Sequence, residues 1–232
     1  MLTKSTIKFI KSLQEKKYRK QEQCFIVEGG KSVKEVLASD FEVRMVVGTE
    51  SFMQALGSVK PTVESYVVKP DVLGSLGDFQ TNDTALAVVK MRNENNLSIA
   101  QDNFTLVLDD IRDPGNLGTI IRTADWYGIK HILASEETVD FYNPKVINST
   151  KGSFTRVQVD YGDLQTILDL NQLPVFGAFL TGENVHHTKF PTAGLLVIGN
   201  ESNGISPALS SKITHPVTIP KFGQAESLNA AV

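Results

Sequence analysis

The sequence of 232 residues has one cysteine and no long apolar run. A single cysteine excludes an intrachain disulfide, and the apolar run at residues 24–27 around Cys24 favours a buried thiol over a reactive one. The N-terminus has no apolar segment of the signal-peptide type, and no stretch of about 18 apolar residues follows. Neither export nor a membrane-spanning helix is indicated, so we expect a cytoplasmic protein.

Two common site signatures are also missing. No Gly-x-Gly-x-x-Gly is present at the first strand–helix turn, which disfavours a nicotinamide enzyme. His186 and His187 have no third ligand at metal spacing, so we predict no metal site. Asp109 and Asp110 follow an apolar run and could bind magnesium, but an acidic pair at a strand end is more often part of a turn.

The charge of the chain is unevenly distributed. The net charge of −3 argues against a nucleic-acid partner, yet residues 1–20 hold seven basic residues and one acidic residue. On a helix, the apolar side chains of this segment share one side and its first lysines the other: Ile7, Ile10 and Leu13 against Lys4, Lys8 and Lys11. A solvated helix face and a surface that contacts phosphate both remain open.

Apolar runs alternate with helical patterns in two parts of the chain. We predict a small α/β domain at residues 1–92, a polar linker at 93–103 and a second α/β domain at 104–232. Strands are predicted at residues 25–27, 43–47, 66–68, 85–89, 104–108, 131–134, 175–179, 195–198 and 217–219. Helices are predicted at residues 32–37, 52–56, 117–128, 144–150, 164–170 and 207–212. The second domain should form a mostly parallel sheet with helices on both faces.

Three short segments of the second domain put glycine and polar residues near the ends of predicted strands, at the edge where open α/β sheets bind ligands. They are Asn116-Leu117-Gly118 with Arg122, Gly199-Asn200-Glu201 with Gly204, and Ser227-Leu228-Asn229. Each alone has a structural interpretation: Asn116 stands where a helix N-cap would be, Arg122 could be a surface residue, Glu201 an acid in a tight turn, and Ser227 the start of a helix.

Together the three segments resemble the signature motifs of the SpoU, or TrmH, branch of the SPOUT RNA methyltransferases. The matching patterns are Asn-x-Gly-x-x-x-Arg-x-Ala at residues 116–124, Gly-Asn-Glu-x-x-Gly at 199–204 and Ile-Pro-x-x-Gly-x-x-x-Ser-Leu-Asn at 219–229. The resemblance covers the chain from residue 104 to its end. The first domain, with Phe25-Ile26-Val27-Glu28-Gly29, is similar to the RNA substrate-binding domain often fused to such enzymes.

The resemblance implies an S-adenosylmethionine-dependent enzyme that methylates the ribose 2′-oxygen of structured RNA, with ribosomal RNA favoured over transfer RNA. A catalytically silent RNA-binding relative and an α/β enzyme of small metabolites remain alternatives. By position in the motifs, the reaction site would comprise Asn116, Arg122, Glu201, Ser227 and Asn229. Residues around the cofactor would be Gly199, Ile219 and Leu228. The basic N-terminal residues expected to contact RNA are Lys4, Lys8, Lys11 and Arg19.

The family resemblance carries further expectations for the second domain. It implies a homodimer through this domain and a deep trefoil knot at the C-terminus, where the long helix that normally follows the third motif is cut short at Val232. Arg122 is often assigned as the base in this family, but a guanidinium with a pKa above about 12 is a poor base. Our hypothesis is that Arg122 binds phosphate and stabilises developing alkoxide charge, while Glu201 and Asn116 orient Arg122 and the ribose.

Overall fold

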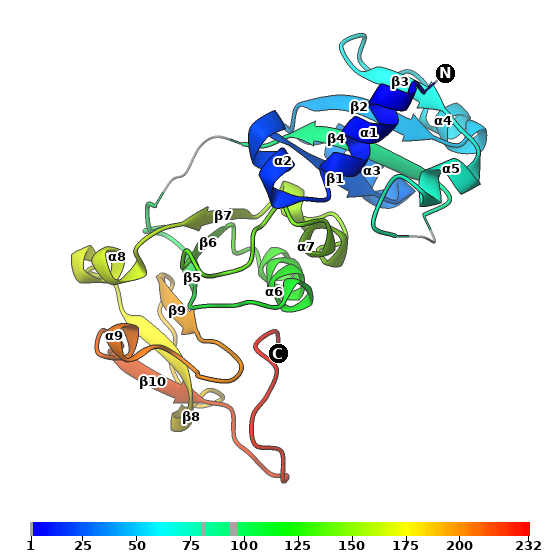
Figure 1. The fold of residues 1–232 in the computed structure, drawn as a ribbon. Helices are drawn as coiled ribbons and strands as arrows, with labels where there is room; N and C mark the ends of the chain where they lie inside the picture. The colour runs from blue at the N-terminus through cyan, green and yellow to red at the C-terminus, as the bar shows by residue number, and fades with distance from the viewer. Residues whose placement is uncertain (1, 80–81, 93–96) are drawn as a thin grey trace. The chain divides into compact units, whose positions relative to one another are not determined.

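The structure is a computed structural model that describes residues 2–79, 82–92 and 97–232 and divides into two compact units (Figure 1). The first unit comprises Met1–Asn93 and Asp140–Thr155, and the second comprises Glu94–Val139 and Arg156–Val232. The structure therefore groups Asp140–Thr155, which lies inside the second predicted domain, with the first unit. Residues 93–96 of the predicted linker lie outside the described residues.

The first unit is built on a mixed four-stranded sheet with the strand order β1-β4-β2-β3. β1 (Cys24–Glu28) and β2 (Val43–Gly48) each pair antiparallel with β4 (Ala85–Lys90), and β2 pairs parallel with β3 (Glu64–Val67). All four strands lie within two residues of their predicted bounds. Every residue of β1 is buried, as expected for a strand covered on both faces.

The first unit contains more helices than the sequence patterns predicted. They are α1 (Lys4–Ser12), α2 (Lys16–Glu22), α3 (Gly30–Leu37), α4 (Glu50–Leu56), α5 (Pro70–Gly74), α7 (Pro144–Ser149) and the 3-10 helix η1 (Ser153–Thr155). Ile10 of α1 and Leu13 just after it are buried against one face of the sheet, together with Cys24 and Ile26. The lysines of α1 are exposed, so the two-sided pattern predicted for this segment is confirmed.

Aromatic packing attaches residues 140–155 to the first unit. The ring of Phe25 on β1 lies 4.7 Å from the ring of Tyr142 and 6.0 Å from that of Phe154, measured between centroids. Phe41 packs on the same rings, 5.8 Å from Phe154. Because successive strand residues point to opposite faces, Phe25 lies on the face away from Cys24 and Ile26, and the segment with α7 covers that face.

The second unit contains a six-stranded sheet with the order β10-β8-β9-β5-β6-β7, in which all described neighbours are parallel. The strands are β5 (Phe104–Leu108), β6 (His131–Ala134), β7 (Gln158–Tyr161), β8 (Val175–Asn184), β9 (Gly194–Ile198) and β10 (His215–Thr218). The predicted parallel sheet is confirmed. β7 was not predicted, because Gln158 and Asp160 interrupt any apolar run.

Helices lie on both faces of this sheet. α8 (Leu164–Leu170) and α9 (Pro207–Ser210) pack on the face that carries Val107 and Val197, and Figure 1 shows α6 (Pro114–Trp126) on the opposite side. No helix within the described residues has the length and apolarity needed to cross a membrane.

After β10 the chain forms neither helix nor strand through residues 219–232. Figure 1 shows this segment leaving the sheet, turning and returning beside α6.

Candidate active site

The first two motifs emerge side by side from the carboxyl edge of the second sheet. β5 and β9 are parallel neighbours in which Leu108 is paired with Ile198, and the amide of Asp109 continues the pairing by donating to the carbonyl of Ile198 over 2.9 Å. The first motif follows β5 and the second follows β9. Strand register alone therefore brings the start of α6 and the loop at residues 199–204 to the same place.

The second motif forms a tight loop closed by its own backbone. The amides and carbonyls of Asn200 and Gly204 are joined by reciprocal hydrogen bonds of 3.0 and 2.8 Å. Gly204 has a φ of +67°, which favours glycine. A Cβ at Gly199 would lie 2.2 Å from the carbonyl carbon of Gly204, so no larger residue fits there. The motif glycines are thus required by the close packing and the conformation of the loop backbone.

The side chain of Asn200 connects the two motif loops. Its Oδ1 accepts hydrogen bonds from the amides of Ser202 (2.9 Å) and Asn203 (3.2 Å), while its Nδ2 donates to the carbonyl of Asp110 over 2.8 Å. Sequence reasoning assigned no role to Asn200 beyond its place in the motif. Its position between two glycine-bounded turns was the available signal, because a short amide side chain often bonds to neighbouring backbone groups.

The N-cap of α6 is Asp113, so the interpretation of Asn116 as the capping residue was wrong. Asp113 Oδ1 accepts the amide of Asn116 over 2.8 Å, and Pro114 occupies the first helical position, which proline favours. Asn116 is therefore the third residue of the helix. Its side chain is not used for capping and can serve the site.

Asn116 joins residues of all three motifs. Its Nδ2 donates to Glu201 Oε1, and its Oδ1 accepts from Asn229 Nδ2 over 2.9 Å. An ionised carboxylate only accepts hydrogen bonds, so Glu201 fixes which end of the Asn116 amide faces it and which end faces Asn229. Three of the five predicted reaction-site residues thus form one hydrogen-bonded row, although they are 85 and 113 residues apart along the chain.

The other two predicted reaction-site residues do not join this row. Arg122 and Ser227 are exposed, and their side chains make no hydrogen bond within the part of the chain that the structure describes. Six residues of helix carry Arg122 about 9 Å along the axis from Asn116. Direct contact therefore does not support the hypothesis that Glu201 and Asn116 orient Arg122. Its guanidinium is open to an external partner.

The residues predicted to surround the cofactor lie at both ends of the returning segment and in the second motif loop. Ile219 directly follows β10 and is 49% exposed, and Leu228, beside Asn229, is 53% exposed. Leu228 precedes Asn229, which Asn116 connects to the carboxylate of Glu201. Half-exposed apolar side chains and polar groups of this kind suit S-adenosylmethionine, which combines an aromatic base with charged groups. The accessible backbone at Gly199 adds donors and acceptors. The residues present therefore fit this cofactor.

Comparison with known proteins identifies the family. Residues 103–232 match the SpoU rRNA Methylase family, and residues 4–87 match the MRM3-like substrate binding domain. The chain is 30% identical to the Bacillus subtilis 23S rRNA (guanosine(2553)-2′-O)-methyltransferase RlmP over 97% of this chain and 91% of that protein. This chain belongs to the SpoU rRNA methylase family.

Solved structures of SpoU-family proteins have the same fold. A TrmH-family protein from Porphyromonas gingivalis is 36% identical, with a TM-score of 0.89 over 100% of this chain and 94% of that one. The SpoU methyltransferase AviRb from Streptomyces viridochromogenes, in complex with AdoMet, is 25% identical, with a TM-score of 0.86 over 99% and 93% of the two chains. The predicted family, the RNA ribose 2′-O-methyltransferase activity and the S-adenosylmethionine cofactor are confirmed.

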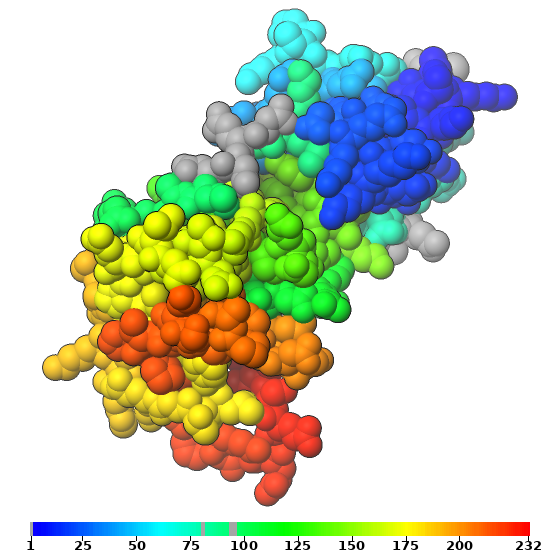
Figure 2. All heavy atoms as spheres, turned by 60° about the vertical axis from the view of Figure 1, so that its left-hand side comes forward, coloured from blue at the N-terminus to red at the C-terminus, as the bar shows by residue number. Residues whose placement is uncertain are grey.

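Within this SpoU-family chain, the substrate-binding unit separates its basic residues into two groups. Lys4, Lys8 and Lys11 are exposed on α1, and Figure 2 shows the start of the chain in dark blue on the surface. Arg19 is only 2% exposed: its Nη1 donates to the carbonyls of Leu13 and Gln14 (3.1 and 2.7 Å).

Arg19 also forms an ion pair of 2.6 Å with Asp140. The prediction that Arg19 contacts RNA was therefore wrong. The break between α1 and α2 leaves carbonyls without helical partners, and Arg19 satisfies them from the inside of the unit.

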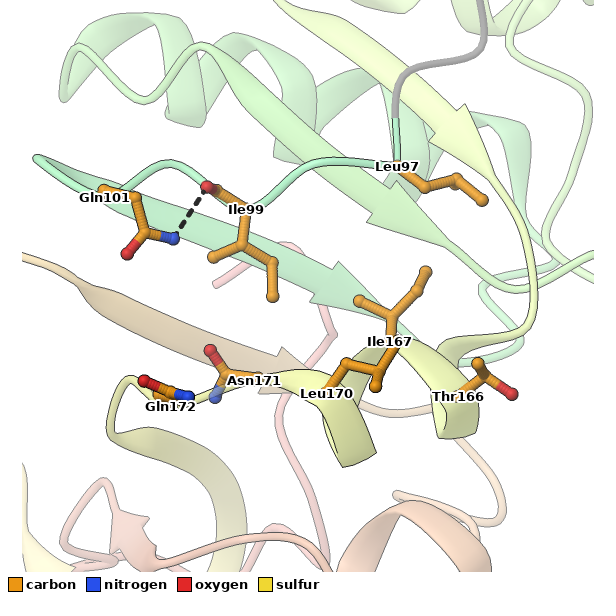
Figure 3. A pocket seen from close by; sticks show the side chains of 8 residues that line it. All are labelled: Leu97, Ile99, Gln101, Thr166, Ile167, Leu170, Asn171 and Gln172. Atoms are coloured by element: carbon orange, nitrogen blue, oxygen red, sulfur yellow. Dashed lines mark hydrogen bonds between the residues drawn. The ribbon is translucent and has the colours of Figure 1, made fainter.

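An open pocket of about 500 Å³ lies elsewhere on the second unit, between residues 97–101 and α8. Figure 3 shows Ile99 facing α8, from which Ile167 and Leu170 line the pocket. None of its lining residues belongs to the three motifs, and none is charged. Among the described residues, no group of three or more His, Cys, Asp or Glu side chains could hold a metal ion.

Proposed function

We propose that Asn116, Arg122, Glu201, Ser227 and Asn229 form the reaction site at which this SpoU-family chain methylates a ribose 2′-hydroxyl of ribosomal RNA. The observation that supports this assignment is the hydrogen-bonded row from Glu201 through Asn116 to Asn229. It joins one polar residue from each of the three motifs at the carboxyl edge of a parallel sheet. Such edges are the usual ligand sites of open α/β sheets.

The row positions the ribose. S-adenosylmethionine supplies a methyl group that its sulfonium already activates, so the protein has to hold the attacking hydroxyl in line with it. Asn116 has both ends of its amide engaged and cannot rotate freely, which gives the ribose a fixed polar surface. Ser227, two residues before Asn229, adds a hydroxyl that can both donate and accept a hydrogen bond.

Arg122 stabilises charge. The ribose hydroxyl loses its proton to solvent water as its oxygen takes the methyl group, and negative charge builds on this oxygen meanwhile. An exposed guanidinium has five donors and remains charged at all working pH values, so Arg122 can bind an RNA phosphate and offset that charge. Exposure without a hydrogen-bond partner among the described residues suits this role better than the role of a base. Substitution of Arg122 by Lys should lower activity at every pH because the planar fork is lost.

The cofactor is held by the backbone at Gly199 and by the side chains of Ile219 and Leu228. The partial exposure of Gly199, which carries no side chain, supports the first contact. The apolar pair supports the second, because both side chains are about half exposed in the protein alone. Burying them against the cofactor would be favourable.

We further propose that the second unit dimerises and that its C-terminal segment is knotted, as the family resemblance implies. Trp126 and Tyr127 at the end of α6 support an interface, because they are 85% and 74% exposed and aromatic residues are enriched at protein contacts. The return of residues 219–229 to Asn116 supports the knot. Sedimentation at several protein concentrations tests the dimer, and Trp126→Ala should weaken it.

Methyl transfer from labelled S-adenosylmethionine tests the reaction site. Ribosomal and transfer RNA from cells that lack this protein are the substrates, and the modified 2′-oxygen is then mapped. We expect label in ribosomal RNA, and we expect Glu201→Gln to reduce kcat roughly 100-fold. Glu183→Gln, which removes an exposed carboxylate from β8, is the matched control and should leave kcat unchanged.

Three other results would each contradict the proposal. Label in transfer RNA alone would establish the alternative substrate. Cofactor binding without any transfer would indicate a catalytically silent relative. Equal rates for Glu201→Gln and Glu183→Gln would show that the hydrogen-bonded row is not the reaction site.

A further inference from the structure

The loop between β5 and α6 presents a second arginine beside the proposed reaction site. Arg112 lies four residues before Asn116, and its side chain is 70% exposed. Its Nε donates to Asp110 Oδ1 over 2.7 Å. Neither of its two terminal amino groups makes a hydrogen bond within the described residues. None of the three motifs contains Arg112, so the family resemblance assigns it no role.

The backbone that carries Arg112 is held on several sides. The amide of Asp110 donates to Ser135 Oγ over 3.0 Å, and its carbonyl accepts from Asn200 Nδ2 over 2.8 Å. The amide of Ile111 donates to Thr138 Oγ1 over 3.2 Å. Asp110 adopts a φ of +59°, which non-glycine residues rarely do, and these bonds keep it there. The arginine therefore projects from a rigid turn.

The acidic residues of this loop leave the terminal amino groups of Arg112 open, although Asp110 forms an ion pair with its Nε. Asp109 is buried, and its Oδ2 accepts the amide of Ser206 over 2.7 Å. Asp113 caps α6 by accepting the amide of Asn116. Asp110 holds only the Nε of Arg112, and this hydrogen bond raises the pKa of the guanidinium. Two parallel N–H groups remain at its end, which is the arrangement that binds phosphate in two places.

We propose that Arg112 binds a backbone phosphate next to the ribose that is methylated, with Asp110 as the residue that positions it. This inference rests on the proposed reaction site. A ribose within an RNA chain has a phosphate on each side. Arg112 belongs to the loop whose Asp110 carbonyl accepts a hydrogen bond from Asn200 of the second motif, and this loop leads directly into the first turn of α6 with Asn116. Arg112 is therefore placed to reach a phosphate beside the nucleotide whose ribose Asn116 holds.

A second arginine–aspartate pair provides a matched control. In the same unit, Arg156 donates through Nε to both carboxylate oxygens of Asp125 (3.0 Å each) and through Nη2 to Oδ2 (2.8 Å). Asp125 therefore occupies one edge of this fork, whereas Asp110 engages Arg112 through a single nitrogen. Arg156→Gln removes the same charge as Arg112→Gln, so a difference between the two variants reports the site and not the net charge.

The experiment measures RNA affinity as a function of salt, with ribosomal RNA transcribed in vitro as the probe. We expect Arg112→Gln to weaken RNA binding roughly tenfold, to reduce the slope of log affinity against log salt by about one, and to raise KM for RNA more than it lowers kcat. Asp110→Asn retains the arginine and should keep the full slope. Arg156→Gln should lose less affinity than Arg112→Gln.

Two further measurements keep the test decisive. The affinity for S-adenosylmethionine, measured by calorimetry, should be the same in every variant and shows that the site is folded. Arg112→Lys keeps the charge but loses the planar guanidinium. The salt slope of RNA binding should therefore stay the same in this variant, while its RNA affinity falls a few-fold. Because RNA binding is measured without turnover, a failure of methyl transfer would not alter this outcome.

Equal reductions of the salt slope in Arg112→Gln and Asp110→Asn would overturn the inference, because Asp110→Asn keeps the charge of Arg112. An unchanged salt slope in Arg112→Gln would also overturn it.

Discussion

The interior of the first unit and the carboxyl edge of the second sheet use polar side chains in opposite ways. In the first unit, Arg19 and Glu28 are 2% and 4% exposed, and protein groups satisfy most of their hydrogen-bonding capacity. At the sheet edge, Asn116 and Glu201 are only partly buried, and Arg122 is exposed without an internal partner among the described residues. Polar groups that the fold has already satisfied stabilise it, and those left open are available to substrate.

Substitution of Arg19 by Met should have the largest effect on stability. It leaves Asp140 without its partner and the carbonyls of Leu13 and Gln14 without their donor. Breaking a buried pair from one side costs about 3–5 kcal/mol. Urea unfolding measures the loss, and Lys16→Met, at an exposed position of α2, should change stability by less than about 0.5 kcal/mol. RNA affinity of the folded Arg19→Met protein should remain that of the wild type.

Substitution of Asn116 by Ala should show the reverse pattern. We expect kcat to fall roughly 100-fold, while the melting temperature changes little because the side chain is only partly buried. Since Asn229 acts through the same hydrogen bond, Asn116→Ala combined with Asn229→Ala should be little worse than Asn116→Ala alone. Asn103→Ala, which removes an exposed amide bonded to the carbonyl of Gly128, is the control. Additive losses of kcat in the double variant would show that the two residues act independently.

The contrast also explains which features could be predicted from the sequence. β5 was predicted to the residue, because a strand buried on both faces reads as one apolar run. The parallel direction of the strands followed from the alternation of strands and helices. The meeting of Asn116, Glu201 and Asn229 followed from the three motifs. β7 could not be predicted, since its pairing with β6, and not an apolar sequence, makes it a strand.

The role of Arg19 depends on contacts that no local pattern encodes. In the sequence, Arg19 is one basic residue of a basic segment and cannot be distinguished from Lys8. In the structure, the break between α1 and α2 at residues 13–15 leaves carbonyls to which Arg19 donates, and Asp140, 121 residues away in the sequence, pairs with it. Asn116 was misassigned as an N-cap for a different reason: Asp113 and Pro114 together start the helix earlier, which is a local signal. Long-range satisfaction of polar groups decided only the role of Arg19.

Glu28 offers a pH test of the buried region. Its Oε1 accepts the amide of Asp78 (3.0 Å) and its Oε2 that of Phe79 (3.2 Å), but burial outweighs these bonds and raises its pKa above 4.5. A raised pKa in the folded state means that the protonated form stabilises the fold. This contribution is complete below the unfolded pKa and is lost as the pH rises through the folded pKa.

Glu28→Gln should therefore remove this pH-dependent loss of folding stability. Stability of the wild type relative to Glu28→Gln should be greatest below the unfolded pKa of a glutamate, about 4.3, and should decline as the pH rises through the folded pKa. Urea unfolding at several pH values measures the difference. The neutral variant also loses one acceptor, at a cost of about 1 kcal/mol that does not vary with pH. Parallel pH profiles for the two proteins would show that the carboxyl titrates normally.

The smallest effect on stability is expected on the exposed face of α1. Lys8→Gln should change the free energy of unfolding by less than about 0.5 kcal/mol, because the side chain is exposed and makes no ion pair among the described residues. If this face contacts RNA, the salt slope of binding should fall by about one. A single substitution tests this better than removal of residues 1–20, since that deletion would also take Ile10, Leu13 and Arg19 from the core. An unchanged slope for Lys8→Gln, beside a reduced slope for Arg112→Gln, would confine the phosphate contacts to the sheet edge.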